Sequence, residues 1–125
     1  MNMDPDPNSG DAAPVDVNRI MAITDGDKDF EQEMISLFLS DFTKRIEAVE
    51  QSLSAGDAET LRRDAHTLKG SSANMGANRL ADLARDIEYA ARDGALGLCP
   101  PMLEAVKIEA ERVREFFTDR LNGAS

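Results

Sequence analysis

The sequence predicts an all-α protein, an antiparallel four-helix bundle with a short additional N-terminal helix, and three observations support this fold class. Residue usage favours helices, because 17 Ala and 11 Leu stand against 5 Val, 6 Ile and six aromatic residues. Residues 15–99 contain no proline, and of the eight glycines only Gly70 falls inside a predicted helix. Apolar residues recur at helical spacing between these boundaries. At 125 residues, the chain is long enough for one domain with a single core.

The N-terminal segment divides into a tail and a short helix. Residues 1–14 are rich in Pro, Asp, Asn, Ser and Gly, which predicts a disordered N-terminal tail before a bundle domain spanning 15–122. Residues 15–23 can form a short helix with Ile20, Met21 and Ile23 as its apolar contacts. The residues TDGD at 24–27 then predict a turn and a helix cap.

The second helix is expected over about 28–54, because it carries a long stripe of apolar residues at helical spacing. This stripe consists of Ile35, Phe38, Leu39, Phe42, Ile46, Val49 and Leu53. The first half of the helix is also apolar outside the stripe, at Phe30, Met34 and Leu37. We expect these three side chains to cover the short first helix; a docking surface for a partner is the alternative.

Three more helices follow. The third runs from Gly56-Asp57 to near Gly76, and its two-in-seven seam is Leu61, Ala65, Leu68, Ser72 and Met75. The fourth, about 77–92, is expected to bury Leu80, Leu83, Ala84, Ile87 and Ala91. The fifth is expected to begin at Pro101, since proline is tolerated in a first helical turn, and to end at Asn122-Gly123. Its apolar face is Leu103, Val106, Ala110, Val113, Phe117 and Leu121.

Composition excludes several classes of function. A formal net charge of -10 argues against nucleic-acid binding, because phosphate backbones repel an acidic chain. A single Cys forms no intramolecular disulfide and indicates a reducing, cytoplasmic setting, and one His with one Cys cannot make a His/Cys zinc site. No apolar run approaches about 18 residues, and the acidic N-terminus has no signal-peptide pattern, so we expect no membrane segment.

The only histidine, His66, is predicted on the outward side of the third helix. With the seam at zero on a helical wheel, His66 falls near about 140°, Lys69 near about 80° and Gly70 near about 180°. A solvated surface histidine is the simple interpretation. The alternative is a reactive imidazole, because small residues follow at Gly70 and Ala73 and Lys69 can place an ammonium beside an anion on the ring.

Local charge and elimination favour the reactive interpretation. Residues 62–79 carry a net charge of +3, from Arg62, Arg63, Lys69 and Arg79 against Asp64. The order of residues around Lys69 is not that of a phosphate-binding loop, no Ser and Asp at suitable spacing suggest a triad with His66, and no Glu-x-x-His motif suggests a di-iron site. An imidazole acting as a covalent nucleophile remains.

The segment 66–77, HTLKGSSANMGA, resembles the signature of histidine-containing phosphotransfer (Hpt) domains. The resemblance implies that His66 carries a phosphoryl group on Nε2, that Lys69 lies beside this group and that Gly70 leaves room for the partner. Glu88 matches a position where related domains place a Glu or Gln near the histidine, and an ion pair with Arg92, four residues later, is its alternative role.

The function implied by this resemblance is that of a phosphorelay intermediate in two-component signalling. It would take a phosphoryl group from the aspartyl phosphate of one receiver domain and pass it to another, so it would be a phosphocarrier rather than an enzyme. Its partners would be receiver domains and a hybrid histidine kinase. We expect a monomer with no cofactor of its own, since magnesium would be held by the receiver. The residues expected to dock the partner are Arg62, Arg63, Ala73 and Arg79.

Two alternatives stay open at this stage. One is the phosphoacceptor domain of a chemotaxis-type kinase, in which a kinase donates the phosphate. The other is a helical interaction module without phosphotransfer. The initial Met and the end of the chain soon after the fifth helix favour a free-standing protein, although a segment cut from a larger kinase would look the same.

Overall fold

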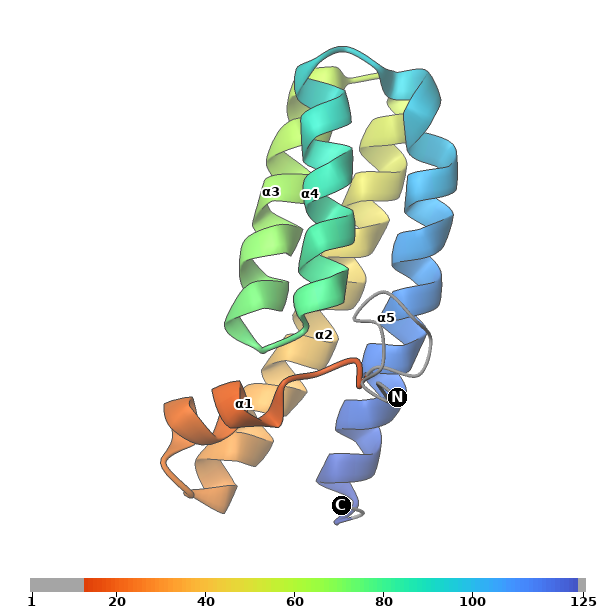
Figure 1. The fold of residues 1–125 in the computed structure, drawn as a ribbon. Coiled ribbons are helices and arrows are strands. Elements are labelled where there is room, and N and C mark those ends of the chain that lie inside the picture. The colour runs from red at the N-terminus through yellow and green to blue at the C-terminus, as the bar shows by residue number, and fades with distance from the viewer. Residues whose placement is uncertain (1–12, 124–125) are drawn as a thin grey trace, which may run out of the picture.

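The protein is a bundle of four long helices with a fifth, short helix at one end, as the computed structural model in Figure 1 shows. The structure describes residues 13–123, so residues 1–12 of the predicted 1–14 tail lie outside the described residues. The bundle confirms the predicted fold class. Its elements are α1 Val17–Thr24, α2 Lys28–Ala55, α3 Ala58–Asn74, α4 Asn78–Arg92, a 3-10 turn η1 Leu96–Leu98, and α5 Cys99–Leu121.

Aspartate side chains cap three of the helices. Asp16, Asp27 and Asp57 precede α1, α2 and α3, and each carboxylate accepts a hydrogen bond of 3.0–3.1 Å from a backbone N–H in the first turn. Such caps satisfy N–H groups that have no partner within the helix. The turn predicted at 24–27 is therefore confirmed, with Asp27 as its capping residue. Gly56 ends α2 in the left-handed conformation, at φ 68°.

The core lies between the predicted apolar stripes of the long helices. Phe38 stacks on Phe42 with ring centroids 4.8 Å apart and meets Phe117 edge-on at 5.6 Å. Burying one such side chain stabilises the fold by about 1.5–3 kcal/mol. The fully buried side chains from the four long helices include Ile35, Phe42, Val49, Leu61, Ala65, Leu68, Leu80, Ala84, Ile87, Val106, Val113 and Phe117.

Two details of the prediction for the ends and apolar faces of the long helices are wrong. Helix α5 begins at Cys99 rather than Pro101, so both prolines of the pair lie within its first turn, where a missing N–H costs no helical hydrogen bond. Phe30 and Leu37 do not cover the first helix, because their side chains are exposed, Leu37 by 72%. Only Met34 of the three apolar residues packs against the core.

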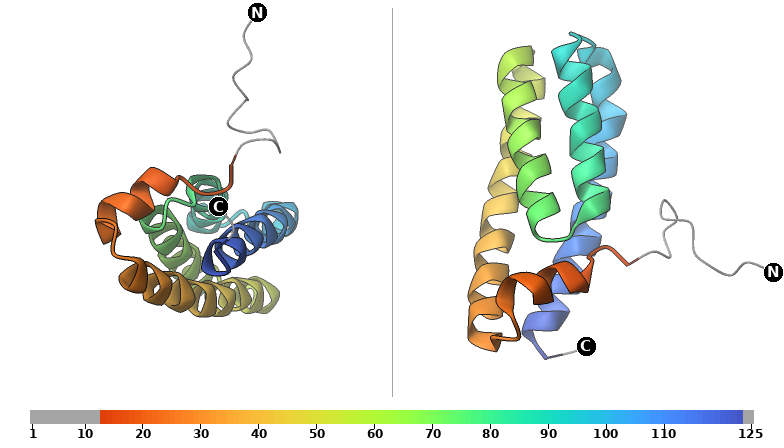
Figure 2. Two further views of the ribbon diagram at one scale, coloured as in Figure 1. Left: turned by 90° about the horizontal axis from the view of Figure 1, so that it is seen from below. Right: turned by 60° about the vertical axis from the view of Figure 1, so that its left-hand side comes forward.

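The reason for the second error is the position of α1. Helices α3 and α4 are shorter than α2 and α5, and α1 runs across the bundle axis beneath the α3–α4 turn (Figures 1 and 2). There Ile20 is fully buried, whereas Met21, an expected contact, is 53% exposed. The backbone N–H of Asp16 donates to the carbonyl of Gly76 over 2.8 Å, which ties the start of α1 to the turn.

A partly buried ion pair joins the ends of α2 and α5. The guanidinium of Arg120 donates two hydrogen bonds, of 2.7 and 3.1 Å, to the carboxylate of Glu31. Each oxygen of the buried Glu31 carboxylate thus accepts one hydrogen bond from the guanidinium. Within residues 13–123, none of the helices is both long and apolar enough to cross a membrane.

Gly76 is the glycine that the fold itself requires. Its φ is 76°, and a Cβ added there would lie 2.7 Å from the carbonyl oxygen of Asp16. We therefore expect Gly76→Ala to lower the free energy of unfolding by about 1–3 kcal/mol, measured by urea denaturation, because the left-handed conformation is strained and the α1 segment must move.

Gly56→Ala is the matched control for this variant. Gly56 has a similar φ of 68°, but an added Cβ there meets nothing within 4 Å. Gly76→Ala should therefore lower the free energy of unfolding more than Gly56→Ala does. Equal losses of stability would show that the close approach of Asp16 to Gly76 does not restrict the residue at position 76.

Candidate functional site

His66 lies in the middle of α3 and points out of the bundle. The seam residues Leu61, Ala65 and Leu68 on the same helix are fully buried, and the wheel therefore places His66 on the exposed side. Its side chain is 61% exposed. The prediction that the imidazole faces solvent is confirmed, and a partner can reach it without any movement of the core.

The ring of His66 is held by Glu88 from α4. Nδ1 of His66 lies 2.9 Å from Oε2 of Glu88, although 22 residues separate the two in sequence. An ionised carboxylate only accepts hydrogen bonds, so Nδ1 must carry the proton. This arrangement selects the tautomer in which Nε2 keeps its lone pair and faces outward. The geometry supplies an oriented, exposed nucleophilic nitrogen.

Lys69 binds the other oxygen of the same carboxylate. Its Nζ lies 2.9 Å from Oε1 of Glu88, so this one side chain contacts both the imidazole and the ammonium. The ion pair between Glu88 and Arg92, which was the alternative role for Glu88, is not formed. Arg92 instead pairs with Asp93 and stacks over the ring of Tyr89.

The electrostatics keep Glu88 ionised. Its side chain is 12% exposed, and this burial alone raises the pKa; the ion pair with Lys69 and the hydrogen bond from His66 outweigh it and hold the pKa of Glu88 below its ordinary value. Because the pKa of Glu88 is lower in the folded protein than in the unfolded chain, its ionised carboxylate stabilises the fold. This contribution is present above the unfolded-state pKa of about 4.3 and is lost as the pH falls through the folded-state pKa. At neutral pH the carboxylate is therefore available to both partners.

Gly70 leaves open space one turn beyond His66. A Cβ added to Gly70 would meet no atom within 4 Å, and the backbone there is ordinary helix. Neither packing nor conformation thus requires a glycine, although glycine costs about 1 kcal/mol in a helix interior relative to alanine. Ala73, one turn further, is also exposed, so a smooth strip of small residues adjoins the imidazole.

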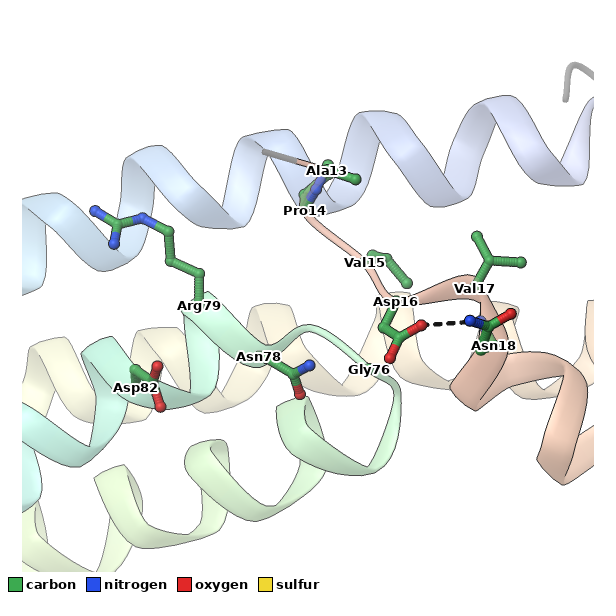
Figure 3. A pocket seen from close by; sticks show the side chains of 10 residues that line it. All are labelled: Ala13, Pro14, Val15, Asp16, Val17, Asn18, Gly76, Asn78, Arg79 and Asp82. Atoms are coloured by element: carbon green, nitrogen blue, oxygen red, sulfur yellow. Dashed lines mark hydrogen bonds between the residues drawn. The ribbon is translucent and has the colours of Figure 1, made fainter. Parts of the chain in front are cut away.

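The four predicted docking residues do not all gather at His66. Arg62 and Arg63 lie one turn before it on α3, where Arg62 forms an ion pair of 2.7 Å with Glu59. Arg79 instead extends from α4 toward α5, away from α3, and lies 3.8 Å from the carboxylate of Glu109 (Figure 3). It lines a separate pocket of about 440 Å³ between the start of α1 and the start of α4.

The structure therefore separates Arg79 from the imidazole. The physical reason is the helical rotation between Arg79 and Glu88, since nine residues at about 100° each place them on opposite sides of α4.

A groove between α2 and α3 adds Ser71 and Asn74, two residues to which the sequence analysis gave no role of their own. It has a volume of about 360 Å³ and lies on the side of α3 away from Glu88. Leu37 of α2 lines it together with Ser71 and Asn74 of α3. The available signal was the excess of apolar residues on α2, for which a docking surface was the alternative interpretation.

No group of three or more His, Cys, Asp or Glu side chains in residues 13–123 is arranged to hold a metal ion. The sequence-based expectation that magnesium arrives with a partner stays a prediction.

Comparison with known proteins gives a consistent result. The family model described as Hpt domain matches residues 33–116. Histidine-containing phosphotransfer protein B (HptB) from Pseudomonas aeruginosa PAO1 is 32% identical, with a TM-score of 0.84 over 89% of this chain and 96% of that one. The Hpt domain of a sensor hybrid histidine kinase from Shewanella is 18% identical, with a TM-score of 0.74 over 90% and 97% of the two chains, and shows the same fold. No curated protein sequence matches this chain.

Proposed function

The chain belongs to the Hpt domain family and has a phosphotransfer role in a two-component phosphorelay, and within this role we propose that His66 is the phosphoacceptor. The observation that carries the proposal is the hydrogen bond from Nδ1 to Glu88, together with the exposure of the ring. This geometry leaves Nε2 as the nitrogen that reacts.

The proposed step is the attack of Nε2 on the phosphorus of a receiver's aspartyl phosphate. The Nε2–P bond forms as the P–O bond to the aspartate breaks, and the aspartate leaves as a carboxylate. The proton stays on Nδ1, so the phosphorylated ring is cationic and the ionised Glu88 compensates its charge over 2.9 Å. Transfer to a second receiver reverses the same step. Positioning and charge stabilisation account for most of the catalysis in such reactions.

We propose a carrier rather than an enzyme, working in the cytoplasm as a monomer between receiver domains and a hybrid histidine kinase. His66, Lys69 and Glu88 supply a nucleophile, a cation and a base that fixes the tautomer. The activated phosphoryl donor and the divalent cation are expected on the receiver. The free-standing protein and a domain of a larger kinase would use these residues in the same way.

The proposed docking surface lies around His66 on α3 and continues into the groove beside α2. The small residues Gly70 and Ala73 admit a partner's backbone close to Nε2. The exposed Leu37 offers an apolar contact in the groove, and Arg62 and Arg63 offer positive charge to the acidic pocket of a receiver.

The test is incubation with a receiver domain carrying labelled aspartyl phosphate. The label should move to this chain, be lost in acid and survive alkali, as a phosphoramidate does. Transfer only from a kinase and ATP would favour the chemotaxis-type alternative. Receiver binding without transfer would favour an interaction module and overturn His66 as the phosphoacceptor.

Lys69→Ala should slow transfer without unfolding the bundle. We propose that its ammonium offsets negative charge on the phosphoryl group, worth roughly 1.5–3 kcal/mol, so the rate should fall about tenfold or more. Rapid-quench kinetics with a phosphorylated receiver measures this.

Lys107→Ala on α5 is the matched control. Lys107 is exposed to a similar extent and forms an ion pair of 2.6 Å with Glu50. It lies away from His66, so its loss should leave the rate unchanged. Equal rates for both variants would show that Lys69 contributes only its ion pair with Glu88.

A further inference from the structure

Helix α1 is short and rests on few contacts, two of which come from one arginine. The helix has 8 residues, of which only Ile20 and Thr24 are buried. A helix of this length is not stable alone in water. Its attachment to the bundle therefore depends on a small number of specific contacts, and Arg19 provides two of them.

Arg19 binds the end of α3. Its Nε donates to the backbone carbonyl of Asn74 over 3.1 Å, and a terminal nitrogen donates to Oδ1 of the same residue over 3.0 Å. Asn74 is the last residue of α3, where carbonyl groups lack helical partners and the helix dipole is negative. A guanidinium matches this position in both charge and geometry.

Asn74 connects this contact to the phosphotransfer face. It lies eight residues beyond His66, about 12 Å along the helix axis, and lines the groove between α2 and α3. Arg19 thus attaches α1 to a residue that lines this groove. Met21 is exposed on α1, and Leu37 is exposed on α2. Neither Arg19 nor Asn74 contacts His66, Lys69 or Glu88 in the part of the chain that the structure describes.

We infer that Arg19 is a positioning residue for the receiver, because its hydrogen bonds to Asn74 fix α1 as part of the docking surface. This inference rests on the proposed function. When α1 is detached, the fraction of molecules ready to bind falls, and the apparent affinity falls by the same factor. The chemical step is not affected, because the three reacting and supporting side chains stand on α3 and α4.

The experiment compares Arg19→Met with Arg92→Met. Methionine keeps much of the aliphatic length and removes both hydrogen bonds, while Arg92 forms an ion pair with Asp93 at the other end of the bundle. Rapid-quench transfer from a phosphorylated receiver, over a range of receiver concentrations, gives the half-saturating concentration and the maximal rate. Hydrogen exchange of the amides in 17–24 reports on α1. Phosphoramidate, a small phosphoryl donor that needs no docking, measures the reactivity of the imidazole.

For Arg19→Met we expect a half-saturating receiver concentration about tenfold higher, faster exchange in α1, and an unchanged maximal rate and phosphoramidate rate. Asn74→Ala, which removes one of the two acceptors, should give a smaller change in the same direction. Arg92→Met should behave as wild type.

Two results would overturn the inference alone: faster exchange in α1 with an unchanged half-saturating concentration, or unchanged exchange in α1. An equal fall in the rate with phosphoramidate would also overturn it, because the imidazole itself would then be disturbed. If the wild-type protein takes phosphate from phosphoramidate and not from any receiver, the proposed function fails, and this inference fails with it.

Discussion

His66→Gln is expected to abolish phosphoryl uptake from a receiver while the bundle keeps its stability. The glutamine amide can still donate a hydrogen bond to Glu88, as Nδ1 does now over 2.9 Å, but it offers no nucleophilic nitrogen. The histidine side chain is 61% exposed, so its replacement removes little packing. Exposed substitutions of this kind change the free energy of unfolding by about 0.5 kcal/mol or less.

The measurement is transfer of label from a phosphorylated receiver, with helical circular dichroism and thermal melting on the same samples. The receiver should keep its label in the presence of the variant and lose it to the wild-type protein. Acid-labile label on the variant would show that another residue accepts the phosphoryl group.

Gly70→Gln is expected to separate function from fold. A Cβ at this position meets nothing within 4 Å and the residue is exposed, so we expect the glutamine side chain to extend into solvent without moving the bundle. Since glycine is about 1 kcal/mol worse than alanine in a helix interior, the melting temperature should be unchanged or raised. The side chain then stands where the receiver must approach Nε2. If the phosphoryl group is held about 1 Å farther from Nε2, the rate of phosphoryl transfer should fall about 100-fold.

Receiver binding and transfer should therefore fall strongly in a protein at least as stable as wild type. Gly97→Gln in the turn before α5 is the control, because an added Cβ there also meets nothing within 4 Å and the site is remote from His66. Wild-type transfer by Gly70→Gln would refute the close-approach argument. A loss of stability would show that the space beside Gly70 is needed by the fold.

The arrangement around His66 was readable because His66, Lys69, Gly70 and Ala73 all lie within one helix, α3. Rotation of about 100° per residue fixes which side chains share a face, so the exposure of His66 and the small strip at Gly70 and Ala73 followed from spacing alone. Spacing also singled out Lys69, and the family resemblance added Glu88, which the structure places in contact with both the ring of His66 and the ammonium of Lys69.

Contacts between helices were harder to predict. Arg79 carries the same charge as Arg62 and Arg63, yet the rotation of α4 turns it toward Glu109 on α5. Leu37 was expected to be covered by the first helix, and it lines the groove beside α3 instead. In both cases the sequence specifies a residue's face on its own helix, but not which neighbour that face meets.

The sequence by itself therefore determined the helices, their buried stripes and the outward position of His66, since these depend on periodicity and capping. Only the tertiary structure decided where α1 rests. The turn between α3 and α4 lies short of the ends of α2 and α5, which leaves room for α1 (Figure 1). The left-handed Gly76 in this turn lets Asp16 approach, and the hydrogen bonds of Arg19 to Asn74 attach α1 to the end of α3. These contacts join residues more than fifty positions apart, and no local pattern encodes the geometry that brings them together.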